Sequence, residues 1–137
     1  MDSAASDFYV DRVRELHLLI GYPHESAPSM GSVEQRALWA RLIAEECREL
    51  LSAIDSANLE GTADGIADVM DVVLGAALTF GLPVAELFNE VHSSNMSKTT
   101  GGVVWREDGK LLRGENYSPP DIRKVLGEVL RDEGHRS

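Results

Sequence analysis

Apolar residues recur at helical spacing along most of the chain. Near the N-terminus, the spacing predicts a helix over residues 7–19, and its apolar face carries Phe8, Val13, Leu16 and Leu19. Gly21, Pro23 and Pro28 then indicate a loop.

A long second helix is expected after this loop. Ser32 is placed to act as its N-cap, and Gln35, three residues further on, is the matching capping-box partner. The apolar pattern continues to about Ala57, through Leu38, Leu42, Ile43, Leu50, Leu51 and Ile54.

A third helix is expected over residues 63–80. Gly61 is interpreted as the break before it, and Thr62 as its N-cap. Gly81, followed by Pro83, is a typical stop signal. The helix is apolar on nearly every side, so it should be buried, and a second subunit is expected to provide part of the cover.

The C-terminal part of the chain has a different character. Pro83 can occupy the first turn of a fourth helix that reaches about His92. The glycine-rich residues 93–120 follow, with a possible short hairpin over 103–112 that turns at Asp108-Gly109.

Ser118 and the two prolines after it are expected to open a last helix, whose apolar side carries Ile122, Val125, Leu126, Val129 and Leu130. The pattern therefore predicts an all-α fold. We expect one domain over residues 1–137, a bundle of four to five helices with a glycine-rich loop or short hairpin before the last helix.

Composition and charge narrow the function. The chain has 137 residues and a net charge of −10, which argues against nucleic acid as a partner because phosphate backbones require a basic surface. A single cysteine, Cys47, excludes an intrachain disulfide. No apolar run is long enough to span a bilayer, and the acidic N-terminus does not resemble a signal peptide, so we expect a cytoplasmic protein.

Six acids lie on the two central helices. Glu45, Glu46 and Glu49 converge on one side of the second helix. Asp64, Asp68 and Asp71 occupy a stripe roughly 60° wide on the third. Acids on a helix that should be buried are costly unless positive charge compensates them.

That positive charge can come from arginines or from metal. Arg36, Arg41 and Arg48 on the second helix would supply an ion-pair network. The acids outnumber these bases, and oxygen-rich sites of this kind suit Mg²⁺ or Mn²⁺. The histidines (His17, His24, His92 and His135) lack metal-ligand spacing and are interpreted as surface or partly packed residues.

The motif Glu45-Glu46-Cys47-Arg48-Glu49, followed by an Asp-bearing helix, resembles the EExxE…ExxD signature of all-α NTP pyrophosphohydrolases. Residues 91–98, 106–110 and 116–120 resemble one branch of phosphoribosyl-ATP pyrophosphohydrolase-like proteins. These families include the MazG-like and dimeric dUTPase-like proteins.

The resemblance implies Mg²⁺-dependent cleavage of a nucleoside triphosphate, with a deoxynucleoside triphosphate preferred, to a monophosphate and pyrophosphate. It also implies a homodimer or a dimer of dimers. Glu45 is then the candidate base for the attacking water, with Glu46 as the fallback. The candidate metal ligands are Glu46, Glu49 and Asp68, with Asp64 or Asp71 completing the set.

Asn95, Lys98 and Lys110 are the candidate contacts to the outer phosphates, with Arg48 and Arg113 as weaker candidates. Trp39 could stack on a base, although packing is the simpler interpretation.

Two positions depart from the family pattern. Gly65 stands where the first acid of ExxD is expected, and Asp64 could supply a replacement carboxylate. Asp71 stands where relatives often have tyrosine, and it could act at the base or sugar end of the substrate.

Two alternatives to a nucleoside triphosphatase stay open. The same chemistry could act on phosphoribosyl-ATP or on a modified nucleotide of a biosynthetic pathway. The missing acid at Gly65 would also fit a non-catalytic helical module that binds a nucleotide or a partner protein.

Overall fold

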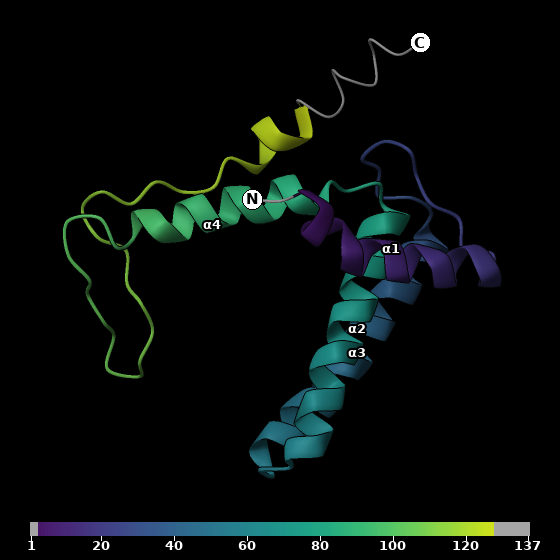
Figure 1. The fold of residues 1–137 in the computed structure, drawn as a ribbon, viewed down its shortest axis with the longest axis horizontal. Coiled ribbons are helices and arrows are strands. Elements are labelled where there is room, and N and C mark those ends of the chain that lie inside the picture. The colour runs from purple at the N-terminus through teal and green to yellow at the C-terminus, as the bar shows by residue number, and fades with distance from the viewer. Residues whose placement is uncertain (1–2, 128–137) are drawn as a thin grey trace. The chain divides into compact units, whose positions relative to one another are not determined.

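The computed structural model describes the backbone of residues 3–127 and the side chains of residues 8–127. Four helices are α1 (Ser3–Ile20), α2 (Val33–Asp55), α3 (Leu59–Thr79) and α4 (Val84–Ser97), and a fifth helical segment covers residues 122–127 (Figure 1). Between residues 3 and 127 no strand is formed, so the expectation of an all-α fold is confirmed. Val129, Leu130 and His135 lie outside the described residues.

The contacts divide the chain into two compact units, unit 1 (Met1–Leu82) and unit 2 (Pro83–Ser137). In unit 1, α2 and α3 run side by side over most of their length, and α1 packs against α3 (Figure 1). The small core contains Trp39, Ala76 and Phe80, so the packing interpretation of Trp39 is confirmed.

The start of α2 follows the expected capping chemistry. Ser32 Oγ accepts a hydrogen bond from the Gln35 amide at 3.1 Å, and Gln35 Oε1 accepts one from the Ser32 amide at 2.9 Å. This reciprocal pair satisfies two amides that have no partner inside the helix, so the capping-box prediction is confirmed.

The expected break between α2 and α3 was placed too late. The chain turns at residues 56–58, where Ala57 has a φ of 55°, and Gly61 already lies within α3. Asn58, not Thr62, is the N-cap, because its side chain accepts a hydrogen bond from the Gly61 amide at 2.9 Å. The Thr62 hydroxyl instead donates to the backbone carbonyl of Asn58 at 2.7 Å.

The end of α3 is confirmed at the predicted glycine. Gly81 has a φ of 64°, and a Cβ there would lie 2.4 Å from the carbonyl oxygen of Ala27. Glycine is therefore required both by the left-handed backbone and by the loop over residues 21–32 that packs against it. Pro83 is the N-cap of α4 instead of its first helical residue, and α4 extends past His92 to Ser97.

In unit 2, the chain leaves the end of α4, forms a long excursion and returns beside the helix (Figure 1). The hairpin over residues 103–112 is reduced to one antiparallel bridge between Trp105 and Leu111, with Gly109 at a φ of 88° in its turn. The returning segment is fixed to α4, since the Asp121 amide donates to Glu90 Oε1 at 2.8 Å.

Several large apolar side chains of unit 1 face solvent in the single chain. On α3, Ile66 and Val73 are 50% and 45% exposed, and on α1 Leu19 is 81% exposed. The third helix is therefore not buried on all sides by its own chain, and cover by a second subunit stays a prediction. In the part of the chain that the structure describes, no single helix is long and apolar enough to cross a membrane. Within that part, only the bent pair of α3 and α4, counted together as one broken span, has the length and composition for it.

Candidate active site

A groove lies between α2 and α3, and three of the six candidate acids line it. Its volume is about 420 Å³, and it is lined by Glu49, Asp64 and Asp68 together with Arg48, Gly65 and small or polar residues of both helix ends. We call it the acidic groove. Glu49 comes from α2 and the two aspartates from α3, so the side-by-side packing of the helices brings together carboxylates that are 15 to 19 positions apart in the sequence.

Gly65 explains why the two helices approach closely at this point. A Cβ at Gly65 would lie 3.2 Å from both Cα and Cβ of Leu50 and 3.1 Å from its Cδ1. Because a backbone atom is among these neighbours, a larger residue cannot enter without moving the helices apart. The departure from the family pattern at Gly65 therefore coincides with a close α2–α3 contact beside the groove.

Glu46 lies next to the groove and carries a buried oxygen with no partner. Its Oε2 atom is inaccessible to solvent and accepts no hydrogen bond. Burial raises the pKa of the Glu46 carboxyl, and the charges of Glu49, Asp68, Glu45 and Asp64 raise it further, in that order. The charges of four other candidate acids therefore disfavour the charged form of Glu46.

The arginines do not neutralise these acids. Within residues 8–127, the salt bridges join Arg12 to Glu15, Arg14 to Asp11, and Arg106 to Asp108, and none includes a candidate acid. Arg36 donates instead to the carbonyl of Gly31 at 2.9 Å. An internal ion-pair network is thus not what balances the carboxylates.

The donor chemistry of the groove fits a hard divalent cation, because carboxylate oxygens are the ligands that Mg²⁺ prefers. The unpartnered Glu46 Oε2 is an atom that such a cation would satisfy. Among the described side chains, however, no three acids, histidines or cysteines are close enough together to hold one ion. Binding would therefore require rotamer changes, which the exposed Glu45, Glu49 and Asp64 side chains allow.

Asp71 belongs to different surroundings from the other acids. It lines a smaller groove of about 180 Å³ between α1 and α3, with Tyr9, Arg12 and Met70 among its neighbours. The charge of Asp71 raises the pKa of His17 and so partly offsets the effect of burial on that ring. It is not among the charges that raise the pKa of Glu46.

Two histidines form a contact that the sequence interpretation missed. His17 is buried, and its Nδ1 lies 2.8 Å from Nε2 of the half-buried His24. Burial is the main cause that lowers the pKa of both rings. The charge of His24 lowers the pKa of His17 further, and the charge of Arg14 lowers the pKa of His24 further. No sequence signal identifies the pair, because His24 lies in a loop whose path depends on packing against α3.

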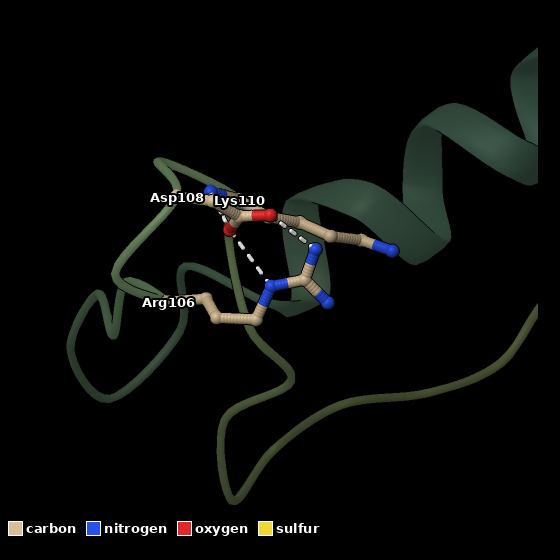
Figure 2. Close-up of polar contacts among 3 residues, drawn as sticks. All are labelled: Arg106, Asp108 and Lys110. Atoms are coloured by element: carbon tan, nitrogen blue, oxygen red, sulfur yellow. Dashed lines mark hydrogen bonds and ion pairs between the residues drawn. The ribbon is translucent and has the colours of Figure 1, made fainter.

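The candidate phosphate contacts Asn95, Lys98 and Lys110 lie in unit 2, whereas the weaker candidate Arg48 lines the acidic groove of unit 1. Lys98 Nζ donates to Asn95 Oδ1 at 3.1 Å, so the structure brings these two residues together at the end of α4. Lys110 lies in the turn of the excursion. Figure 2 shows that Arg106 pairs with Asp108, at 2.7 Å from Nε to Oδ1, while the ammonium group of Lys110 extends away from that pair.

The comparison with protein families gives one match. The model of the phosphoribosyl-ATP pyrophosphohydrolase family matches residues 13–95, which is more than half of the chain. The matched range contains all six candidate acids and Asn95, and it ends before Lys98 and Lys110. Among curated proteins, no sequence matches the chain.

Proposed function

The chain belongs to the phosphoribosyl-ATP pyrophosphohydrolase family, and from this membership we propose that it hydrolyses a nucleoside triphosphate to the monophosphate and pyrophosphate. The expected substrate is a deoxynucleoside triphosphate, and the reaction is expected to depend on Mg²⁺. The observation that carries the proposal is the set of mutually repelling carboxylates around Glu46, which lack a cationic partner within the described residues.

Glu46, Glu49 and Asp68 are the proposed metal ligands, with Asp64 completing the set. Asp64 lines the acidic groove together with Glu49 and Asp68 and acts on the charge of Glu46. Asp71 lines the other groove and is proposed to influence specificity instead. When bound, Mg²⁺ or Mn²⁺ neutralises phosphate charge and favours ionisation of a water molecule.

Glu45 is the proposed general base. It is exposed on α2 directly before Glu46, so a water molecule can reach its carboxylate. Glu46 is less suited to this step if it binds metal. In the proposed step, the proton from water passes to the Glu45 carboxylate as the water oxygen attacks phosphorus, and the α,β-anhydride bond breaks to give the monophosphate and pyrophosphate.

The outer phosphates require positive charge, and Lys98 and Lys110 are its proposed source. Lys98 and Lys110 form no salt bridge within residues 8–127, so their charges are available to an anionic ligand. Asn95 holds the ammonium group of Lys98 by its hydrogen bond and positions it. We propose these three residues as substrate contacts.

Phosphoribosyl-ATP is a second candidate substrate, favoured by the name of the family whose model matches the chain. Both candidates contain the same phosphoanhydride linkage, so the chemistry assigned to the carboxylates is unchanged. The two differ in what must be recognised beyond the phosphates.

We further propose that the chain assembles as a homodimer or a dimer of dimers in the cytoplasm. The exposed apolar residues of α1 and α3, including Leu19, Ile66 and Val73, support this, because a second subunit would remove them from water. A 15.0 kDa monomer in light scattering at micromolar concentration would contradict it.

A pyrophosphate-release assay over a panel of ribonucleotides, deoxyribonucleotides and phosphoribosyl-ATP tests the activity. We expect release of pyrophosphate and a monophosphate with Mg²⁺ or Mn²⁺, poor activity with Ca²⁺, and no activity in excess EDTA. Release of single phosphate groups, or full activity in EDTA, would contradict the proposed reaction.

A further inference from the structure

In unit 2, two cationic side chains lie close to one aromatic ring. The guanidinium carbon of Arg113 lies 4.8 Å from the centroid of the Tyr117 ring, and Lys98 Nζ lies 5.9 Å from the same centroid. We call these three residues the cation cluster. Lys98 ends α4, whereas Arg113 and Tyr117 belong to the returning part of the glycine-rich excursion.

Backbone contacts build this arrangement. A Cβ at Gly114 would lie 3.4 Å from the carbonyl oxygen of Lys98, so the two segments pass each other closely. Ser97 Oγ accepts a hydrogen bond from the Ser118 amide at 2.9 Å, and the Tyr117 amide donates to the carbonyl of Gly114 at 3.2 Å. The residues on both sides of Tyr117 are therefore fixed against the end of α4.

The charges of the cluster are not balanced by the protein. Neither Lys98 nor Arg113 forms a salt bridge in the described part of the chain, although the whole sequence has a net charge of −10. The Tyr117 ring attracts both cations, but it carries no net charge that would offset their mutual repulsion. An anion with several charged oxygens that contacts both cations would do so, and the planar fork of Arg113 suits two phosphate oxygens.

We propose that Lys98, Arg113 and the Tyr117 ring form a binding site for a diphosphate group, in which the ring positions both cations. This inference rests on the proposed function. It makes Arg113, a weaker phosphate candidate from the sequence, a defined contact, and it adds Tyr117 to the residues that recognise the substrate. The diphosphate is either the outer part of a bound triphosphate or the released pyrophosphate.

The test is calorimetric titration of the full chain with inorganic pyrophosphate, at low ionic strength and in EDTA, where no divalent cation contributes. Arg113→Gln is expected to weaken binding by about tenfold or more, because charge-assisted hydrogen bonds are lost. The matched control is Arg123→Gln, which removes the same charge from an exposed position in unit 2 and should bind as the wild type does. Tyr117→Leu should weaken binding severalfold, whereas Tyr117→Phe keeps the ring and should preserve it.

Melting curves of each variant separate a binding defect from a folding defect. A titration with a nucleoside α,β-methylene triphosphate separates the two origins of the diphosphate. If Arg113→Gln weakens binding of this triphosphate and of pyrophosphate equally, the site holds the outer part of the bound triphosphate. If it weakens binding of pyrophosphate alone, the site holds the released product. No saturable binding by the wild type, or equal affinities of Arg113→Gln and Arg123→Gln, would overturn the proposal. Asp68→Asn distinguishes this result from the proposed function, because it should bind pyrophosphate normally in EDTA even though its turnover should be about a thousandfold lower.

Discussion

In unit 1, the carboxylates of α2 and α3 lie beside one another without a cationic partner, whereas in unit 2 Lys98 and Arg113 surround one ring without a carboxylate partner. Among residues 8–127, neither set of side chains forms a salt bridge, although other charges of the same units do, such as Arg106 with Asp108. Like charges within each set repel one another, and a ligand of opposite charge would relieve that repulsion. We therefore propose that the carboxylates of unit 1 attract cations and that the cations near Tyr117 in unit 2 attract anions.

The largest expected effect is on turnover when the acidic groove loses a metal ligand. Glu49→Gln and Asp68→Asn should each lower kcat by about a thousandfold, since a bound metal supplies several kcal/mol of transition-state stabilisation. Pyrophosphate release and circular dichroism should be measured together, because the helices should persist. Glu34→Gln, an exposed acid in the first turn of α2, is the control and should keep full activity.

The second effect separates the two aspartates that flank Asp68. Asp64→Asn should lower turnover on every nucleotide by at least about tenfold, as expected for the loss of a ligand. Asp71→Tyr should mainly change the order of preference among nucleotides. The assay is the same nucleotide panel, with Glu60→Gln as the control from the first turn of α3. If Asp64→Asn keeps wild-type turnover, Asp64 is not a metal ligand, and its role is only the favourable interaction of an acid with the N-terminal end of a helix.

The third effect concerns the glycine at the α2–α3 contact. Gly65→Glu introduces the acid that the family pattern contains, yet it should destabilise the chain by about 1–3 kcal/mol because the new side chain meets the Leu50 backbone. Denaturant unfolding measures this, and Ala63→Glu at an exposed position of α3 is the control. Unchanged stability together with higher activity would show that the helices can separate at this point.

A smaller effect of opposite sign is expected at Glu46. The pKa of the Glu46 carboxyl is higher in the folded chain than in the unfolded chain, so the charged form is disfavoured by folding. The stability that the protonated carboxyl contributes is therefore complete below its pKa in the unfolded chain, and it is lost as the pH rises through its pKa in the folded chain. Glu46→Gln should therefore raise the melting temperature at neutral pH in EDTA and lose the further rise that Mg²⁺ gives the wild type. A lower melting temperature in EDTA would mean that the Glu46 carboxylate stabilises unit 1.

The smallest effect is a pH dependence from the histidine pair. Burial lowers the pKa of His17 and His24 below the ordinary 6.5, so their contribution to stability is complete above that pH and is lost as the pH falls through the folded values. The urea midpoint should decrease as the pH falls below about 6.5. His24→Gln should flatten this decrease, whereas the exposed His92→Gln should not change it. Equal slopes for both variants would contradict the assignment.

Much of the helical fold follows from local sequence signals. The capping box at Ser32 and the stop at Gly81 are both confirmed, because each depends on residues within one turn. The start of α3 was predicted four residues late, since Asn58 provides a better cap than the break expected at Gly61. Capping preferences at neighbouring candidates differ by only about 1 kcal/mol, so local rules locate such ends imprecisely.

The candidate site was partly predictable for a similar reason. Helical periodicity places Glu45, Glu46 and Glu49 on one side, but it cannot tell which groove each aspartate of α3 lines. That choice depends on how α1 and α2 pack on opposite sides of α3. The His17–His24 contact and the cations around Tyr117 depend on loop paths, which no periodic pattern encodes.

The central claim is that the acidic groove of unit 1 holds the divalent cation, and a Mn²⁺ titration followed by electron paramagnetic resonance tests it most directly. The account predicts saturable Mn²⁺ binding by the wild type, at least about tenfold weaker binding by Asp68→Asn, and unchanged binding by Glu34→Gln. Equal Mn²⁺ affinities of the wild type and Asp68→Asn would contradict it.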